Sequence, residues 1–215
     1  MTDAPFDLSQ TDKLLTTTRA VRKRLDLERP VDIQVILDCI DLAQQAPTGG
    51  NRQRWRWIVI TDPDKRREIA QTYIDGGSEY LAGAGASDTP DAEQTARVRQ
   101  SSRFLPEILA QVPALVIPCS LGRPEKLPIA GQASFYGSII PAIWSFNLAL
   151  RSRGLGTVYT TLHLNEEKRA AQILGIPDDA TQLALLPVAY TKGTDFKAVE
   201  RPPVTDIVGI NGWPA

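Results

Sequence analysis

The stretch APTGGNRQRW, residues 46–55, separates an apolar helical pattern from a run rich in tryptophan and β-branched residues. Its two adjacent glycines permit unusual backbone conformations and let a chain approach a ligand closely. Thr48, Asn51 and Gln53 add hydrogen-bond donors and acceptors, a set that suits a heteroaromatic ring with alternating carbonyls and nitrogens. A helix C-cap followed by a turn accounts for the same residues, so the flanking chain must decide between the two.

Helix and strand patterns flank this stretch. Apolar residues recur at helical spacing over 33–43, and Asp32 is available as the N-cap. The side chains of residues 55–61 alternate in character with a period of two and are rich in β-formers, which predicts a strand. Asp62 followed by Pro63 is typical of the start of another helix. The stretch is therefore a connection between a helix and a strand.

The alternation continues to residue 190. Further elements are expected at 91–111 (polar helix), 113–120 (strand), 134–153 (apolar helix), 157–162 (strand), 166–175 (helix capped by Asn165) and 183–190 (strand). Mobile loops are expected at 76–90 and 121–131, and an extended C-terminal arm at 193–215. Because long helices outweigh short strands, we predict one α+β domain over 1–215, with three layers and a central mixed sheet flanked by helices.

Composition excludes several functional classes. The chain has 24 basic and 25 acidic residues and a net charge of −1, so nothing favours binding to nucleic acid or to an anionic membrane surface. The N-terminus has no signal-peptide pattern, and no uninterrupted apolar run approaches the roughly 18 residues that span a bilayer. These features predict a cytoplasmic protein.

The residues that support metal or nucleophilic chemistry are scarce. Cys39 and Cys119 lie in apolar runs and are expected to be buried, reduced thiols. His163 is the one histidine and has no acidic or nucleophilic partner nearby in sequence, so we expect a surface or packing role for it. No metal site and no Ser-His-Asp triad are predicted. Any chemistry therefore requires an organic cofactor.

Two further stretches suit a phosphate and a flat ligand. In TTTRAVRKRL, residues 16–25, Arg19 and Arg22 are three apart, so in a helical turn both guanidinium groups face a phosphate on one side. In RGLGTVYTTLH, residues 153–163, a strand ending in small hydroxyl residues exposes backbone N–H groups. A solvated basic turn and a plain strand edge are the respective alternatives.

Together, in this order and spacing, these stretches resemble the FMN-dependent nitroreductase family. The family's Arg-Arg-Ser-x-Arg motif is matched by residues 18–22, and its Ala-Pro-Ser-x-x-Asn-x-Gln-Pro-Trp motif by residues 46–55. A Pro-Ala helix is matched at 141–142, a Gly-Leu-Gly strand at 154–156, and a closing Arg-Pro at 201–202. The resemblance covers residues 14–205 and implies a dimeric nitroreductase-like fold.

The chain departs from the family pattern at several positions. Thr18 replaces the first arginine and Ala20 the serine, so the phosphate site depends more on Arg19 and Arg201. Arg54 stands in place of proline, which alters the loop at that point, and Leu162 lies where some members have glycine.

The resemblance also implies roles for individual residues. Arg19 would bind the FMN phosphate, and Arg22 would face the phosphate or the flavin N1/O2 edge, where it would stabilise the reduced ring. The backbone of residues 160–162 would lie near N5, and Pro47, Thr48 and Asn51 would come from the second subunit of an obligate homodimer. The cofactor-binding residues implied are Arg19, Ala20, Arg22, Pro47, Thr48, Asn51, Gln53, Thr160, Thr161, Leu162 and Arg201.

The activity implied by the resemblance is a ping-pong oxidoreductase reaction. NADH or NADPH would deliver a hydride to flavin N5, and an electron-poor small molecule such as a nitroaromatic or a quinone would then take the electrons. No catalytic side chain is required, because the cofactor carries the chemistry. The alternatives are a dehalogenase, an enoyl reductase or a flavin-cleaving enzyme of the same fold, and a non-catalytic flavin-binding or storage protein.

Overall fold

The computed structural model describes residues 4–82 and 92–214. The chain divides into two compact units, residues 19–194 and the paired ends 1–18 with 195–215. The larger unit contains α2 (Ile33–Ala43), α3 (Pro63–Gly76), α4 (Ser78–Leu81), α5 (Ala92–Ile108), α6 (Ile129–Ser152), α7 (Glu167–Leu174), β1 (Trp55–Ile60), β2 (Ala114–Leu121), β3 (Leu155–Gly156), β4 (Ala180–Gln182) and β5 (Leu186–Tyr190). Its short 3-10 segments are η1 (Gly49–Asn51), η2 (Leu109–Gln111), η3 (Pro124–Lys126) and η4 (Leu162–Glu166).

Two of the predicted helix starts are confirmed in atomic detail. The Asp32 carboxylate accepts a hydrogen bond from the backbone N–H of Gln34 at 2.9 Å, where α2 begins. The Asp62 carboxylate accepts from the N–H groups of the second and third residues of α3, after Pro63 at the first position. Both caps satisfy N–H groups that have no partner within the helix.

The five strands form a single sheet in the order β1-β2-β5-β3, with β4 also paired to β2. Every pairing between the described strands is antiparallel, so the prediction of a mixed sheet is wrong in this respect. β2 lies at the centre, because β1 pairs along one edge and β4 and β5 pair along the other.

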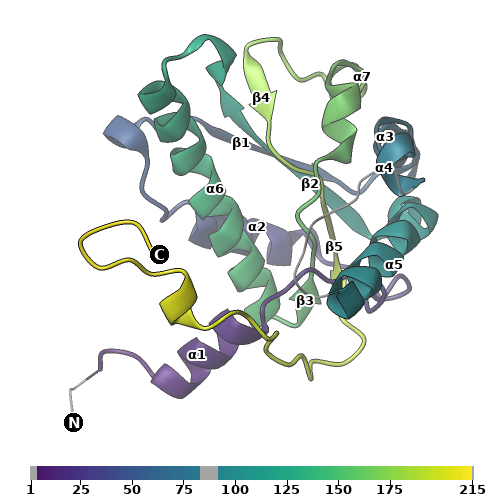
Figure 1. Ribbon diagram of the computed structural model, residues 1–215. Coiled ribbons are helices and arrows are strands. Elements are labelled where there is room, and N and C mark those ends of the chain that lie inside the picture. The colour runs from purple at the N-terminus through teal and green to yellow at the C-terminus, as the bar shows by residue number, and fades with distance from the viewer. Residues whose placement is uncertain (1–3, 83–91, 215) are drawn as a thin grey trace. The chain divides into compact units, whose positions relative to one another are not determined.

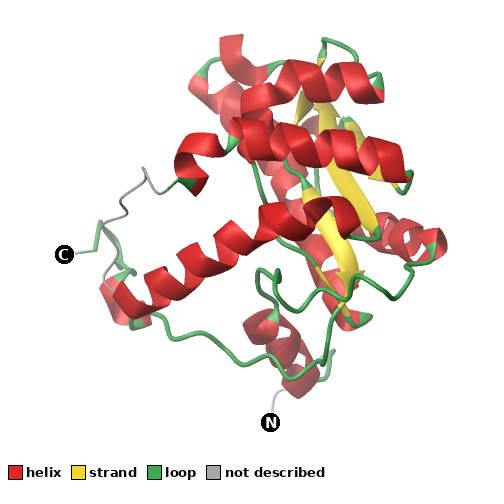
Figure 2. Ribbon diagram, turned by 90° about the vertical axis from the view of Figure 1, so that its right-hand side faces the viewer, coloured by secondary structure: helices red, strands yellow, loops and turns green. Residues whose placement is uncertain are grey.

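Helices cover both faces of the sheet, which gives the predicted three layers (Figures 1 and 2). On one face, α2 and α6 pack against Val116 of β2 and Val188 of β5 in a continuous apolar core. Side chains alternate along a strand, so Leu115 and Ile117 point to the opposite face. Buried residues of α3, α5 and η2 complete that second core.

The long helix α6 has one buried side and one exposed apolar side. Ile139, Ile143 and Phe146 are fully or almost fully buried in the core. On an adjacent side, the exposed fractions are 86% for Ile129, 37% for Tyr136, 46% for Ile140 and 45% for Trp144. Among the described helices, only α6 is long and apolar enough to cross a bilayer, a test that core helices also pass.

Some predicted elements differ in the structure. In place of a strand over 157–162, β3 ends at Gly156 and η4 begins at Leu162, with a single bridge between Thr160 and Leu185. Asn165 does not cap α7; it lies in η4, and its side-chain amide donates to the carbonyl of Gly76 at 2.6 Å. The amide thus joins η4 to the end of α3.

The predicted loops contain some regular structure. α4 lies within 76–90, of which 83–90 fall outside the described residues, and η3 and the start of α6 lie within 121–131. The polar helix predicted at 91–111 is present as α5 followed by η2.

The smaller unit contains α1 (Leu8–Thr17), which the sequence analysis did not predict, and η5 (Val204–Asp206). α1 begins at Asp7, whose carboxylate accepts from the N–H of Gln10 at 3.2 Å. Several large apolar side chains of this unit are exposed, including Phe6, Ile210 and Trp213.

Candidate functional site

The basic stretch predicted to bind phosphate lies between α1 and α2 and is not helical. Residues 19–22 form an extended segment and a bend, so Arg19 and Arg22 do not share a helical face as predicted. The physical reason is a tertiary hydrogen bond: the N–H of Val21 donates to the carbonyl of Thr157 at 2.9 Å. A sheet-edge contact therefore replaces helical pairing in this segment.

That hydrogen bond brings two groups of predicted residues to one edge of the fold. Val21 packs against Gly156, where an added Cβ would lie 3.0 Å from the Val21 Cβ and 2.7 Å from the Thr191 methyl group. The glycine thus allows the basic segment to lie directly on the chain that continues to Thr160 and Leu162. Arg19 is exposed at this edge, and Arg22 is half-buried.

The guanidinium of Arg22 has one donor without a partner in the described part of the chain. Its Nε is buried and has no hydrogen-bond partner among the described residues. Burial lowers the pKa of this guanidinium, while the neighbouring hydroxyls of Tyr73 and Tyr80 act in the opposite direction. Burial also raises the pKa of Tyr73 to about 12, so this tyrosine is neutral and supplies no counter-charge at neutral pH. A buried donor without a partner is costly, so an acceptor from a bound ligand or a water would stabilise it.

The segment after β3 is held rigidly. The Thr160 hydroxyl donates to the carbonyl of Leu185 at 2.6 Å, and the N–H of Leu185 donates to the carbonyl of Thr160 at 2.8 Å. Leu162 packs on the end of α3, where a Cβ added to Gly76 would lie 2.4 Å from the Leu162 carbonyl oxygen. Thr161, between these two anchors, is exposed.

His163 follows directly and is fully buried. Of the surface and packing roles expected for it, the structure therefore supports packing. Burial lowers its pKa to about 4, and Glu167 acts weakly in the opposite direction. The imidazole is therefore neutral at neutral pH. Neither ring nitrogen has a hydrogen-bond partner among the described residues.

The loop after α2 is more than a helix cap. α2 ends at Ala43, several residues before the 3-10 segment η1. Gly50, Asn51 and Gln53 all have positive φ, at 62°, 53° and 46°. Two of these are not glycine, a backbone strain that clusters at functional sites.

Hydrogen bonds hold this loop on α6. The N–H of Gly49 donates to the Ser138 hydroxyl at 2.9 Å, and the Trp55 indole N–H donates to the Ser138 carbonyl at 2.8 Å. Within the loop, the Gln53 amide donates to Asn51 at 2.7 Å. Ser138 was not singled out from the sequence, although Ser134 and Ser138 lie one turn apart on an otherwise apolar helix, a signal that would have found them.

A cavity of about 330 Å³ lies between the loop, the β2 end and the first half of α6. Thr48 and Gln53 line it, whereas Pro47 and Asn51 do not. Its other lining residues are Gly49, Gly50, Arg52, Arg54, Trp55, Ser120, Leu127, Gly131, Ser134, Phe135 and Ser138.

The predicted site residues thus form two groups in the larger unit. Arg19, Arg22 and residues 160–162 share one edge, and none of them lines the cavity that Thr48 and Gln53 share. Arg201 belongs to the smaller unit and is exposed.

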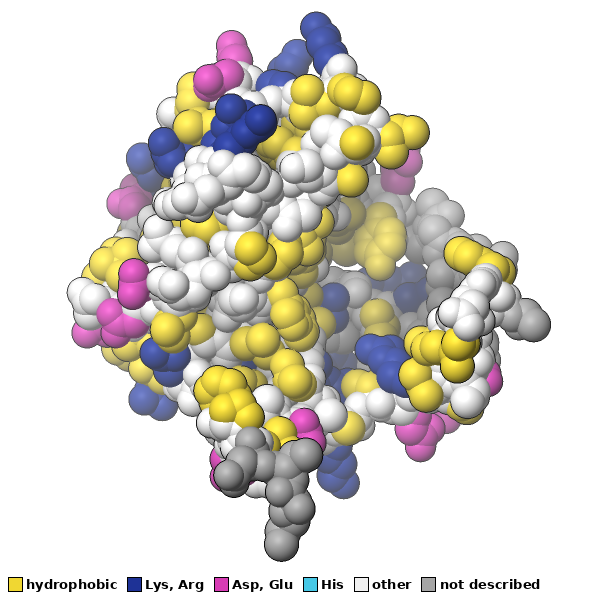
Figure 3. Space-filling model, turned by 90° about the vertical axis from the view of Figure 1, so that its left-hand side faces the viewer, with side chains coloured by type: hydrophobic (Ala, Val, Ile, Leu, Met, Phe, Trp, Pro, Cys, Tyr) yellow, Lys and Arg dark blue, Asp and Glu magenta, His cyan; other side chains and the backbone are white. Residues whose placement is uncertain are grey.

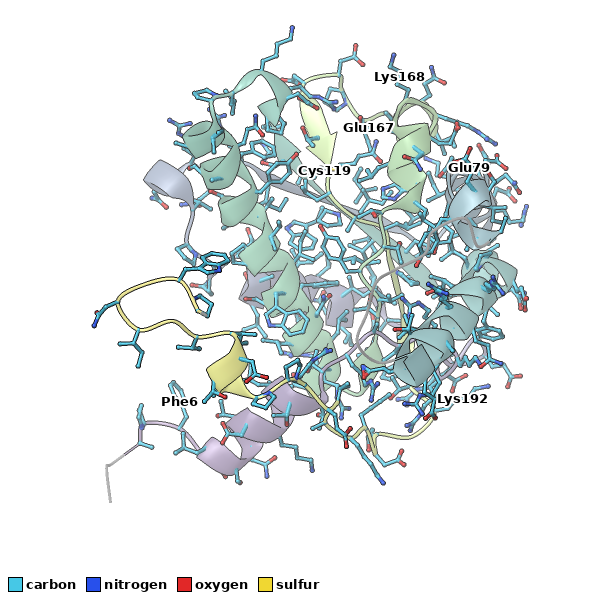
Figure 4. All side chains as sticks on the ribbon, in the orientation of Figure 1. Phe6, Glu79, Cys119, Glu167, Lys168 and Lys192 are labelled. Carbon is cyan, nitrogen blue, oxygen red and sulfur yellow. The ribbon has the colours of Figure 1, made fainter. Side chains whose placement is uncertain are left out.

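A second cavity, of about 680 Å³, lies beside α7 and β4 and contains none of the predicted residues. Glu167 and Lys168, which line it, lie at the start of α7 (Figure 4). Arg123 crosses it and donates to the Glu167 carboxylate at 2.7 and 3.1 Å. Arg123 and Glu167 therefore neutralise each other in this cavity, which Lys168 and Asp178 also line.

Potential metal ligands and both cysteines lie among the described residues. No group of three or more His, Cys, Asp and Glu side chains among them is placed to hold a metal ion. Cys39 and Cys119 are buried, free thiols, and Cys119 lies inside the sheet (Figure 4). Burial raises the pKa of Cys119 to about 12, so this thiol is not a nucleophile at neutral pH.

Comparisons with known proteins find relatives that span most of this chain. Residues 15–190 match the profile of the Nitroreductase family. Iodotyrosine deiodinase 1 of Rattus norvegicus is 27% identical over 201 residues, which cover 91% of this chain and 67% of the deiodinase. The chain thus spans about two thirds of that relative. A putative NADH dehydrogenase/NAD(P)H nitroreductase of Archaeoglobus fulgidus is 21% identical over 182 residues, 84% of each chain.

Among solved structures, oxidized iodotyrosine deiodinase bound to FMN and 3-iodo-L-tyrosine superimposes with a TM-score of 0.72. The two chains are 22% identical, and the alignment covers 94% of this chain and 99% of the other. This likeness concerns the fold.

Proposed function

Because this chain belongs to the nitroreductase family, we propose that it is an FMN-dependent oxidoreductase. Bound FMN would supply the redox chemistry, in which NAD(P)H is oxidised and an electron-poor small molecule is reduced in alternate half-reactions. With a quinone acceptor, NAD(P)H and one proton yield NAD(P)⁺ and the hydroquinone. The observation that carries the proposal is the buried, unpartnered Nε of Arg22 at the edge formed by residues 19–22 and 157–162.

The residues at this edge fit a flavin nucleotide. Arg22 would donate to the polar N1/O2 edge of the ring and stabilise negative charge there, which removes the cost of its unmade hydrogen bond. Arg19, exposed beside it, would bind the terminal phosphate. The backbone of residues 160–162, fixed by Thr160 and by the contact at Gly76, would lie along the ring.

The remaining predicted contacts would come from a second copy of the chain, in a homodimer. Pro47, Thr48, Asn51 and Gln53 form a separate group on the loop that α6 supports. The exposed side of α6 carries a band of apolar side chains (Figure 3). Burying such a band against a second copy would remove it from water and would carry each loop toward the partner's flavin.

A second candidate activity is reductive dehalogenation of an aromatic ring. The similarity to iodotyrosine deiodinases favours it over an enoyl reductase or a flavin-cleaving activity. In that reaction NAD(P)H supplies a hydride equivalent, the carbon–halogen bond breaks, and halide is released as the ring gains hydrogen. A flavin-storage role, in which no acceptor turns over, is the non-catalytic candidate.

We further propose a cytoplasmic location and no role in binding nucleic acid or membranes. A net charge of −1 and two free, buried cysteines support this proposal.

The first test is the visible spectrum of the purified protein, together with its flavin content. We expect about one FMN per chain and no FAD, and bleaching of the spectrum by NADH or NADPH under anaerobic conditions. Steady-state oxidation of NAD(P)H with menadione, a nitroaromatic and 3-iodotyrosine then distinguishes the candidates. Turnover of iodotyrosine alone would assign dehalogenation, and bleaching without turnover of any acceptor would indicate storage. A colourless protein that binds no added FMN would overturn the proposal.

A further inference from the structure

The charged residues that line the cavity between the 48–54 loop and α6 are all basic. Two guanidinium groups, those of Arg52 and Arg54, line it, and its lining includes no acidic side chain. Throughout residues 4–82 and 92–214, no carboxylate forms an ion pair with either arginine. The cavity therefore presents two positive charges without a counter-charge from this chain.

Both arginines are exposed at the rim of this cavity, each beside a glycine. A Cβ added to Gly122 would lie 3.6 Å from Nη1 of Arg54 and 3.5 Å from the Phe135 ring, so both side chains lie next to this glycine. The N–H of Leu121 also donates to the Arg54 carbonyl at 3.0 Å. Gly50 has the positive φ of the left-handed region. A Cβ added to Gly50 would lie 3.7 Å from Nε of Arg52, so the Arg52 side chain lies beside this glycine.

The rest of the lining suits a small ring with polar substituents. Phe135 and Leu127 provide apolar surface, and Ser120 and Ser134 provide hydroxyls that donate or accept. A volume of about 330 Å³ lies at the lower end of the range of small-molecule pockets, about 300–1,000 Å³. A single ring with an acidic group fits this volume, whereas a whole dinucleotide does not.

We propose that this cavity binds the carboxylate of a small aromatic acid, which Arg52 and Arg54 hold through their planar forks. The inference deepens the proposed function, on which it rests: it assigns the electron acceptor to the class of anionic ring compounds. Arg54 occupies the position of a proline in the family motif, so this charge is a feature of the present chain.

Two acceptors of matched size and reactivity test the proposal in the FMN-loaded protein. 4-Nitrobenzoate and 4-nitrobenzamide differ in charge but share the ring and the nitro group. We expect kcat/KM for the acid to exceed that for the amide by about 10- to 100-fold, the usual effect of a charge-assisted hydrogen-bonded pair, and to fall with added salt. The preference is expected in KM, because the arginines bind the substrate and take no part in electron transfer.

The variant carrying Arg52→Gln and Arg54→Gln should lose this preference and keep its turnover of the uncharged amide. The variant carrying Arg67→Gln and Arg97→Gln is the matched control, since it removes the same charge from exposed arginines that pair with Asp64 and Glu93. Calorimetric titration with 4-nitrobenzoate, without reductant, measures binding independently of turnover.

The outcomes distinguish the proposed activity from the anion site. Oxidation of NAD(P)H with neither compound, but tighter binding of the acid than of the amide, refutes the proposed activity and keeps the anion site. Equal kcat/KM and equal affinity for acid and amide refute the anion site and leave the oxidoreductase intact. A loss of NADPH affinity in the Arg52/Arg54 variant, with acid binding unchanged, would refute the anion site by assigning the arginines to the nucleotide phosphate. If the wild-type protein is a dimer, and the Arg52/Arg54 variant is a monomer that binds the acid as tightly as wild type, the two arginines belong to the contact with the second copy. That result would also refute the anion site.

Discussion

Replacing Arg22 by methionine separates stability from cofactor binding. Methionine keeps most of the buried stem and removes a guanidinium whose Nε lacks a partner in the described residues. An unsatisfied buried polar group costs about 1–3 kcal/mol, so the flavin-free protein should gain up to about that amount of unfolding free energy. The same change removes a charged donor to FMN, worth about 1.5–3 kcal/mol, and should weaken FMN binding by about 10- to 100-fold. Stability and affinity are thus expected to move in opposite directions.

Arg24→Met is the matched control. The Arg24 Nε donates to the carbonyl of Lys192 at 2.8 Å, so its loss should lower the unfolding free energy by about 1 kcal/mol and leave FMN affinity unchanged. Urea unfolding of the flavin-free proteins and calorimetric titration with FMN measure both quantities. An Arg22→Met protein that is less stable than wild type and binds FMN equally well would refute the assignment of Arg22 to the cofactor.

Three further predictions follow from the site and from α6. Arg19→Ala should weaken FMN binding by about one to two decades and Arg24→Ala only slightly, measured by calorimetry; equal effects would mean that the phosphate is misplaced. The pKa of His163 is about 4 in the folded protein, against an ordinary value of 6.5. Between these pH values the unfolded chain binds more protons than the folded one, so the free energy of unfolding should fall by about 3 kcal/mol as the pH drops from 6.5 to 4. Because the chain has one histidine, this slope should be absent in His163→Leu, measured by urea unfolding at several pH values, and an unchanged slope would contradict the assignment. In sedimentation at micromolar concentration we expect a dimer, and Ile140→Lys on the exposed side of α6 should yield monomers that lose FMN; a wild-type monomer that retains FMN tightly would disprove the shared site.

Local signals predicted much of the fold correctly. Asp32 and Asp62 mark helix starts because a capping carboxylate acts within three residues of its partner N–H groups. The almost fully buried strand β2 and the apolar helix α6 were also evident, because both contain few polar residues. In each case the cause lies in neighbouring residues.

The errors occurred where distant contacts override local preference. β-branched residues at 157–161 favour a strand, but hydrogen bonds to Leu185 and the packing of Leu162 on Gly76 end the strand early. Asn165 suits a helix cap, but the carbonyl of Gly76, far away in sequence, captures its amide. Local periodicity does not reveal such partners.

The candidate site could be predicted in part. The family resemblance implied that Pro47, Thr48 and Asn51 serve a second subunit, and in the structure Thr48 lines a cavity that Arg19, Arg22 and residues 160–162 do not line. The role of these residues in cofactor binding stays a prediction. The electrostatic surroundings of Arg22 include Tyr73 of α3 and Tyr80 of α4, which come from a different part of the sequence.

The central position of β2 determines when the chain can fold during synthesis. β1 precedes β2 and can pair with it early, but β4 and β5, which cover the other edge, begin only at Ala180 and Leu186. Until those residues emerge from the ribosome, an almost entirely apolar strand offers an open edge to other nascent chains. A fragment that stops before Ala180 should therefore aggregate, although it contains most of the helices and the site residues of the first group.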